Sequence, residues 1–447
     1  MLSAHAQSRQ RVRIFLWIIL GLVVFAVGFS AVYRAAWDDI QRTDYTVYTA
    51  AGQAVLDHTD IYRAHNARGW SYVYPPPFAL LLAPLARLPG TLGALLWYLL
   101  EIGSLVATSW MAVFMLKRDI PDHHKDLLYA LPILSLATLL VSGAMRCQAS
   151  GFMIALMVAA FHWHFRGKPV FAGLSLAAAT VLKVFPITLL LYFIARRQWR
   201  TVMVTLGGIV LLMLLPALFW GWHTNLDMIA RWTDVVGRTA LISNPGRALA
   251  SPLFGQLLDA YKPRNQSLEA LLLSASLSPA LVKYGVVLCA TLMMAAMLLA
   301  SKAVVDTTTE LALASAFMVW TLLVPPVSET HYFGALIMPI TTLLGLILYG
   351  SLDRHRQRWG IITLGAVMIG VMFLIGWETT AVLRPLCLAS LLLWGVLTGF
   401  VVRYRPLALM NAALHDRAGL EGADNAPVAA VPVIDHPDHT AEAERRD

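Results

Sequence analysis

The stretch IFLWIILGLVVFAVGFSAVY, residues 14–33, is followed a few residues later by QRTDYTVYTA, residues 41–50. The first stretch is apolar and about 20 residues long, the length a helix needs to cross the hydrocarbon core of a bilayer. The basic sequence MLSAHAQSRQRVR precedes it. Because the apolar run exceeds the core of a cleaved signal peptide, we predict an uncleaved first membrane helix with a cytoplasmic N-terminus. The second stretch places Asp44 just beyond this helix.

The whole chain has the composition of a polytopic membrane protein. Hydrophobic residues make up 58% of its 447 residues and charged residues only 13%, which excludes an ordinary soluble globular protein. The formal net charge of +8 lies in short clusters between apolar runs, so it indicates membrane topology and no nucleic-acid partner. Three cysteines without CxxC spacing argue against a disulfide framework or a zinc site.

Further apolar runs continue almost to the C-terminus and predict membrane helices. They cover about 92–116, 127–145, 151–165, 202–220, 281–300, 311–326, 333–350, 360–377 and 385–402.

The remaining apolar segment, residues 170–195, has two interpretations. As a single crossing it would put its flanking clusters, RGK and RRQWR, on opposite sides of the membrane. Positive charge favours the cytoplasmic side for both clusters. Because Lys183 and Pro186 interrupt the run, we predict two short half-helices that form a hairpin with both ends in the cytoplasm.

These runs predict an all-α fold with about 12 transmembrane helices and both chain ends inside. Residues 1–407 would form the membrane domain. Residues 408–447 are polar and rich in Ala, Pro and Asp, so we expect a disordered cytoplasmic tail.

The first outer loop, residues 35–77, has helical spacing that puts Asp44, Tyr48 and Ala51 on one face. The prolines of YPPPF, residues 74–78, are expected to stop a helix before an apolar segment too short to cross. We therefore expect this loop to be amphipathic and to lie along the outer membrane surface.

Four polar motifs that are far apart in the sequence share the outer face in this topology. They are DYTVY near Asp44, MRCQAS near Gln148, PRNQSL near Asn265 and PPVSETHYF near His331. Polar groups gathered on one face predict a single site. A carboxylate shielded at the membrane boundary can act as a general base on a hydroxyl group. The structural alternative is that Asp44 only begins a helix or pairs with Arg42 or Arg34.

The order of these motifs resembles glycosyltransferase family 87. The motifs are DYTVYTAAGQAVLDHTDIY, YPPPFALLLAPLARLP, a Gln-containing turn before a helix, AGLSLAAATVLKVFPITLLLYFIARRQWR, NQSL and SETHY, and they cover the chain up to about Arg405. Members of this family resemble the mycobacterial polyprenol-phosphate-mannose-dependent mannosyltransferases, which have the GT-C fold. The resemblance implies transfer of a hexose, such as mannose, from a polyprenyl-phosphate-sugar donor to a glycolipid or glycan acceptor. It also implies a multi-pass protein of a bacterial inner membrane, with the active site facing the periplasm.

The resemblance also implies roles for individual residues. Asp44 would be the catalytic base of an inverting displacement in which polyprenyl phosphate leaves. A leaving phosphate requires positive charge or hydrogen-bond donors. His331 matches the family histidine and is expected to contact the phosphate or the acceptor. Lys183 matches a lysine before a proline, here in LKVFP, and is expected at the phosphate end of the donor pocket. The other predicted substrate-binding residues are Tyr48, Gln148, Arg264, Asn265, Gln266 and Glu329.

Each of these residues also has a structural interpretation. His331 could be a satisfied helix-cap residue, and Lys183 could extend to the membrane interface. The NQS sequence, residues 265–267, could be a simple turn. Glu101, inside the apolar WYLLEIGSL, could be a buried ion-pair partner.

The sequence lacks a phosphate-cradling Gly loop, GxSxG and HExxH, which argues against a nucleotide-sugar donor and a zinc hydrolase. A lone Asp predicts no obligatory divalent metal and no cofactor. The alternative function is a flippase or transporter of lipid-linked sugars. Such proteins often have two related halves with interrupted helices at matching positions, whereas the only clear break here is near Lys183.

Overall fold

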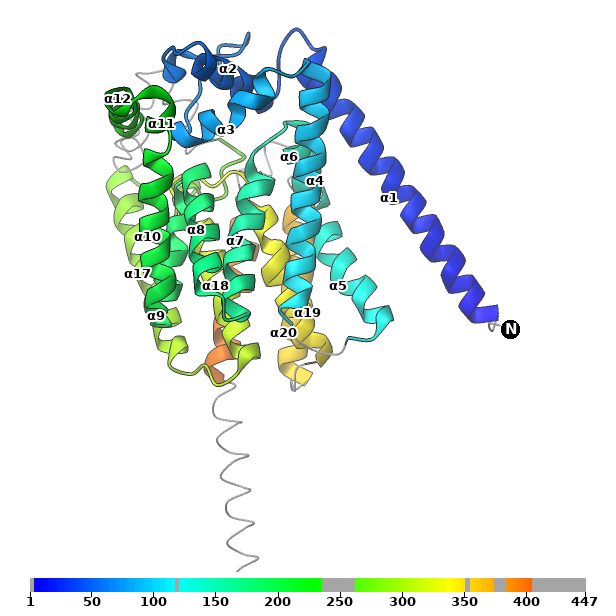
Figure 1. Cartoon of the computed structure of the whole chain (residues 1–447). Coiled ribbons are helices and arrows are strands. Elements are labelled where there is room, and N and C mark those ends of the chain that lie inside the picture. Colours follow the sequence, from blue (N-terminus) through cyan, green and yellow to red (C-terminus); the bar gives the residue numbers. More distant parts are fainter. Residues whose placement is uncertain (1–3, 117–119, 235–261, 350–353, 374–382, 404–447) are drawn as a thin grey trace, which may run out of the picture. The chain divides into compact units, whose positions relative to one another are not determined.

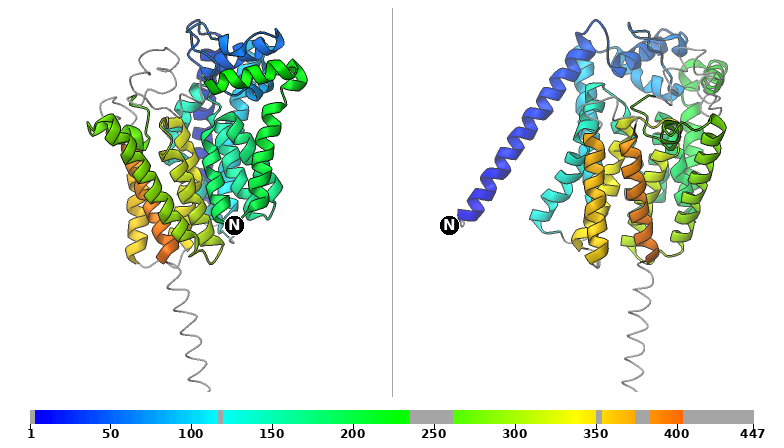
Figure 2. Two further views of the ribbon diagram at one scale, coloured as in Figure 1. Left: turned by 90° about the vertical axis from the view of Figure 1, so that its left-hand side faces the viewer. Right: turned by 180° about the vertical axis from the view of Figure 1, so that it is seen from behind.

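A computed structural model describes residues 4–116, 120–234, 262–349, 354–373 and 383–403. The predicted tail, 408–447, lies outside these residues. The described part is helical and contains no β-strand, only two isolated β-bridges. Figures 1 and 2 show most of the long helices running side by side in a bundle, with α1 slanting away from them. The predicted all-α fold is therefore confirmed.

Six described segments are long and apolar enough to cross a membrane. They are α1 (Ala4–Ala36), α4 (Gly90–Phe114), α10–α11 (Trp199–Leu214 and Ala217–Trp220), α17 (Pro279–Ser301), η4–α19 (Thr330–Leu336 and Ile337–Tyr349) and the helix Pro385–Arg403. The pair α5 (Asp122–Ser135) and α6 (Ala137–Met145), bent by 63°, would be a seventh span. The chain is thus a multi-pass membrane protein.

Several of the other predicted crossings form shorter helices, which is one reason why fewer than about 12 helices of the described residues have spanning length. Four apolar segments of this kind run beside the long helices: α7 (Ser150–Phe165), α8 (Pro169–Leu182), η2–α9 (Phe185–Leu189 and Leu190–Ala195) and α18 (Thr307–Leu323). A further helix, α20 (Arg354–Met372), begins with the basic sequence RHRQR.

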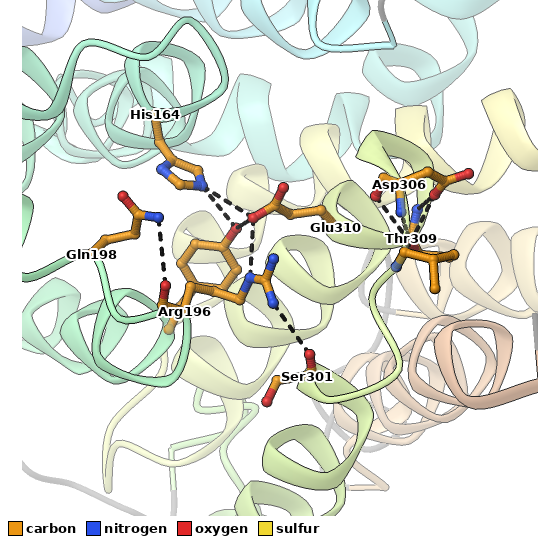
Figure 3. Close-up of polar contacts among 9 residues, drawn as sticks. His164, Arg196, Gln198, Ser301, Asp306, Thr309 and Glu310 are labelled. Atoms are coloured by element: carbon orange, nitrogen blue, oxygen red, sulfur yellow. Dashed lines mark hydrogen bonds and ion pairs between the residues drawn. The ribbon is translucent and has the colours of Figure 1, made fainter. Parts of the chain in front are cut away.

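The predicted hairpin at residues 170–195 is present. After α8, Lys183 adopts an extended conformation (φ −149°, ψ 135°), and the chain returns through η2 and α9. His164, near the end of α7, and Arg196, after α9, both contact Glu310 in the first turn of α18 (Figure 3). The distances to Glu310 Oε1 are 3.4 Å from His164 Nε2 and 3.1 Å from Arg196 Nε. The RGK and RRQWR clusters therefore lie at the same end of the bundle, here called the basic end.

Two short helices, α2 (Asp44–Leu56) and α3 (Pro76–Ala86), lie across the opposite end, here called the α2 end (Figures 1 and 2). The prolines of YPPPF, residues 74–78, start α3. The prediction that they stop a helix is therefore wrong. Proline suits the first helical position because the N–H it lacks would have no intrahelical partner there. The two helices pack closely, since a Cβ on Gly52 would lie 2.7 Å from the backbone O of Leu82.

The close packing of α2 on α3 predicts that Gly52→Ala destabilises the protein. The atom that a new Cβ would meet belongs to the backbone of Leu82, so it cannot move aside as a flexible side chain could. Overpacking of this kind costs about 1–3 kcal/mol. Thermal unfolding in detergent should show a lower midpoint for Gly52→Ala than for Gly103→Ala, because a Cβ on Gly103 meets no atom within 4 Å. Equal midpoints would contradict the close contact.

Candidate active site

Asp44 begins α2 and is held by the turn between α6 and α7. Its backbone N–H donates to the O of Arg146 at 2.9 Å, and its Oδ2 accepts a hydrogen bond from Gln148 Nε2. Arg42 pairs instead with Asp38, with Nε and Oδ2 3.5 Å apart. The helix-start interpretation of Asp44 is confirmed, since Asp44 is the first residue of α2, where a carboxylate interacts favourably with the helix N-terminus.

The surroundings of Asp44 change its ionisation. The pKa of Asp44 is raised to about 7, first by burial and then by the negative charge of Glu329, while the positive charge of Lys183 lowers it. The carboxyl group is therefore part protonated and part ionised near neutral pH. A pKa close to the working pH suits a general base.

Tyr48 lies one turn after Asp44 on the buried face of α2. Its hydroxyl is 3.0 Å from the Tyr74 hydroxyl and accepts a hydrogen bond from the backbone N–H of Ala149 at 3.3 Å. Its ring packs edge-on against Phe78 of α3. Tyr48 thus connects α2, α3 and α7, and its predicted contact with substrate stays a prediction.

Lys183, at the end of α8, brings a cation to the same region. Its Nζ donates to Ser150 Oγ at 3.4 Å and lies 4.1 Å from the centroid of the Tyr332 ring and 5.7 Å from that of Tyr74. A cation over an aromatic face gains about 0.5–2 kcal/mol. Because the ammonium group contacts side chains of three other segments, the structure favours an internal role over extension to the membrane interface.

The segment before α19 supplies Glu329 and His331. His331 Nδ1 lies 3.4 Å from Glu329 Oε2. The His331 ring is buried, and its Nε2 has no hydrogen-bond partner among the described residues. The positively charged side chains of Lys183 and Arg264 both interact electrostatically with this ring. His331 therefore has one nitrogen available beside the lysine.

Glu101, in α4, is packed against the segment that carries Gln148. Two glycines make room for it: a Cβ on Gly151 would lie 3.0 Å from Glu101 Cγ, and one on Gly143 would lie 3.9 Å from Glu101 Oε1 and 3.6 Å from the Cβ of His331. No described residue forms an ion pair with Glu101 within 4.0 Å, so the ion pair considered for it is not observed. Within the described part of the chain, Glu101 Oε2, Gln148 Oε1 and His331 Nε2 are all buried without a hydrogen-bond partner.

Asn265 forms hydrogen bonds within the protein. Its Oδ1 accepts from the backbone N–H of Ser328 at 2.9 Å and of Ser267 at 3.2 Å, and its Nδ2 donates to the O of Pro326 at 2.9 Å. The side chain is 1% exposed. The structure thus gives Asn265 a role in joining two segments, and the predicted sugar contact stays a prediction.

Gln266 and Arg264 flank Asn265 and differ in exposure. Gln266 is buried, with Nε2 donating to the O of Pro263 at 2.9 Å and Oε1 accepting from the backbone N–H of Leu386 at 3.3 Å. Arg264 is exposed, and its backbone O accepts from the N–H of Thr330 at 3.1 Å. Their predicted substrate contacts also stay predictions.

The contacts described above gather most of the predicted site residues at the α2 end. Asp44 contacts Gln148, and Tyr48 and Lys183 both contact Tyr74. Lys183 and His331 both contact Tyr332, and His331 contacts Glu329. The charges of Lys183 and Glu329 act on the Asp44 carboxyl group. No site role was predicted for Tyr74, Tyr332 or Arg384. The only sequence signal for the two tyrosines was that they lie inside the motifs YPPPF and PPVSETHYF.

The sequence was compared with models of known protein families. A family model, glycosyltransferase family 87, matches residues 72–301, just over half of the chain. The chain belongs to glycosyltransferase family 87. The matched range contains Gln148, Lys183 and Asn265, whereas Asp44 and His331 lie outside it. The site roles of Asp44 and His331 in this glycosyltransferase therefore rest on the contacts described above and not on the family match.

Other comparisons add little about this family 87 protein. No curated protein matches it at a significant level. Among solved structures it is similar to the crystal structure of ArnT from Cupriavidus metallidurans bound to undecaprenyl phosphate, with 12% sequence identity over 88% of this chain and 78% of that chain. The TM-score is 0.37, too low to establish a common arrangement of helices.

Proposed function

We propose that this glycosyltransferase moves a hexose, such as mannose, from a polyprenyl-phosphate-sugar to a hydroxyl of a glycolipid or glycan acceptor. The observation that carries the proposal is that Asp44, Lys183 and His331 come from three distant segments to the α2 end. Lys183 Nζ lies 4.1 Å from the centroid of the Tyr332 ring and the His331 ring centroid lies 4.5 Å from it, while the charge of Lys183 acts on the Asp44 carboxyl group. A buried base beside a cation suits a reaction in which a hydroxyl loses a proton and a phosphate departs.

The proposed reaction is a single displacement. The acceptor hydroxyl oxygen forms a bond to the anomeric carbon as the bond from that carbon to the phosphate oxygen breaks. Asp44 accepts the hydroxyl proton, and polyprenyl phosphate leaves with the electron pair of the broken bond, which inverts the anomeric centre. Lys183 would stabilise the negative charge on the leaving phosphate. Gln148 holds the Asp44 carboxylate in place through the hydrogen bond to Oδ2.

Three buried polar atoms support substrate binding beside Asp44. Glu101 Oε2, Gln148 Oε1 and His331 Nε2 have no hydrogen-bond partner within the described residues. A buried polar group without a partner costs about 1–3 kcal/mol in a folded protein. Hydroxyl groups of a sugar or of the acceptor could supply the missing hydrogen bonds. We propose His331 as the group that contacts the acceptor or the phosphate.

The membrane orientation follows from charge. The basic end carries the RGK and RRQWR clusters, and positive clusters in short loops favour the cytoplasm. The α2 end would then face the periplasm of a bacterial inner membrane. Donors on that side are expected to be lipid-linked, and membership of family 87 implies the GT-C fold that such enzymes share.

A transfer assay tests the proposed function. The purified protein is incubated with radiolabelled polyprenyl-phosphate-mannose and a glycolipid extract from bacterial membranes, and the products are separated by chromatography. We expect label in a new glycolipid, and no label transfer from a labelled nucleotide sugar. Movement of the labelled donor across sealed vesicles without a new covalent product would contradict the proposal and indicate a flippase.

The ionisation of Asp44 predicts how transfer depends on pH. The base must be ionised to act, and its pKa is raised to about 7. Each pH unit below the pKa lowers the ionised fraction about tenfold. The kcat/KM for the donor should therefore rise with pH up to about 7 and level off above it. A profile that is flat between about pH 5 and 7 would contradict this role of Asp44.

A further inference from the structure

Arg384 is a fully buried arginine at the α2 end, one residue before the helix Pro385–Arg403. Its side chain is 2% exposed, and its φ of 51° lies in the left-handed region. A residue other than glycine in this conformation costs about 1–3 kcal/mol and persists only where neighbouring contacts hold it. The local contacts of Arg384 must therefore be strong.

The guanidinium group of Arg384 binds the backbone of the loop formed by residues 262–265. Its Nη1 donates to the backbone O of Lys262 and of Asn265, both at 2.7 Å, and its Nε donates to Ser274 Oγ at 3.1 Å. The planar guanidinium offers several donors in a fixed geometry, which the single ammonium of a lysine cannot reproduce. Residues 262–265 are thereby held against the start of the last described helix.

The same loop is paired with the segment that carries Glu329 and His331. Asn265 and Glu329 form an isolated antiparallel bridge. The backbone N–H of Gln266 donates to the O of Ser328 at 2.8 Å, next to the bond from the N–H of Thr330 to the O of Arg264. His331 follows this paired stretch directly. The position of its backbone thus depends on the loop that Arg384 holds.

We propose that Arg384 is a positioning residue of the transfer reaction, which acts by holding Glu329 and His331 against Asp44 and Lys183. This inference rests on the function proposed above. Arg384 itself is too buried to contact substrate, so its effect passes through the paired loop and segment. A displacement of about 1 Å at reacting groups can lower a rate about 100-fold.

The matched control is Arg196 at the basic end. Arg196 also joins separate segments, through Glu310 Oε1 at 3.1 Å and the backbone O of Ser301 at 3.2 Å (Figure 3). Among the residues that the structure describes, its contacts with other segments lie at the basic end. Arg196→Met should therefore lower the thermal unfolding midpoint without a matching loss of kcat.

The test compares Arg384→Met, Arg384→Lys and Arg196→Met. We expect a loss of kcat of about 10- to 100-fold in Arg384→Met, and a smaller loss in Arg384→Lys. Because the charge of Glu329 raises the pKa of Asp44, displacement of Glu329 should also move the acid limb of the pH profile to lower pH. Equal kcat values for Arg384→Met and Arg196→Met, with an unmoved acid limb, would overturn the proposal.

Hydrogen exchange gives a readout that does not depend on the donor. In Arg384→Met, the amides of Gln266, Ser328 and Thr330 should exchange faster, whereas Arg196→Met should leave them unchanged. Suppose that wild-type protein transfers no sugar, but these amides exchange faster only in Arg384→Met. The proposed function then fails, while the link from Arg384 to the His331 segment stands. If the amides do not respond to Arg384, the positioning role fails whatever the activity.

Discussion

Asp44→Asn should abolish sugar transfer while the protein remains folded. An amide has nearly the shape of the carboxylate and can still accept the hydrogen bond from Gln148. It cannot accept a proton from the acceptor hydroxyl. Loss of general-base catalysis lowers rates by about 100- to 10,000-fold, and we expect an effect at the upper end of this range because the base is buried. The measurement is release of labelled product under single-turnover conditions, with thermal unfolding recorded in parallel.

The control for Asp44 lies at the other end of the same helix. Asp57 caps α2 and accepts a hydrogen bond from Gln53 Nε2 at 2.8 Å, in an exposed position. Asp57→Asn makes the same chemical change without touching the site, so its transfer rate should stay close to wild type. Transfer by folded Asp44→Asn at the rate of Asp57→Asn would rule out Asp44 as the base.

The second large effect is expected from Lys183→Gln. If the ammonium stabilises the leaving phosphate, its removal should lower kcat about 100- to 1,000-fold, as for the loss of one preorganised donor at a developing charge. Lys183→Arg keeps the charge but changes its shape, so an intermediate rate is expected. The measurement is kcat and the donor KM for each variant in the transfer assay.

A second lysine provides the matched control for Lys183. Lys168, in the RGK cluster, lies 5.3 Å from the centroid of the Trp163 ring. It therefore resembles Lys183 in being a cation near an aromatic face, but it lies at the basic end. Lys168→Gln should leave kcat within about twofold of wild type, as is usual for changes away from a reacting centre. A comparable loss in both Gln variants would mean that Lys183 acts through general stability, which would contradict a role at the phosphate.

Much of the fold could be predicted because membrane insertion follows simple local rules. The length of apolar runs predicted the long helices, and the charge around residues 170–195 predicted a hairpin that the Glu310 contacts confirm. The same run lengths predicted about 12 crossings, but several runs fold as helices shorter than a span. The Pro-rich start of α3 was also misjudged, because proline can begin a helix as readily as it ends one.

The candidate site was predictable only in part. Asp44 and Lys183 stand out in sequence because each is a charge at an apolar boundary. Asn265 looked suited to sugar hydroxyls, yet its amide joins its own loop to the segment before His331. Pairing between loops more than 50 residues apart leaves no local pattern. For the same reason, no local pattern indicated that Arg384 holds the loop around Asn265.

The hairpin with Lys183 at its tip limits where residues can be inserted into the chain during evolution. Its α9 end is attached to Glu310 through Arg196, and His164, in the last turn of α7 just before the hairpin, contacts the same carboxylate, while Lys183 stands at the far tip. The depth of the ammonium group is therefore set by the number of residues in the α8 arm. One inserted residue in α8 would advance the tip by about 1.5 Å and rotate it by about 100°, turning the lysine away from its aromatic neighbours. Insertions should thus accumulate in the outer loops, while the arm keeps a constant length.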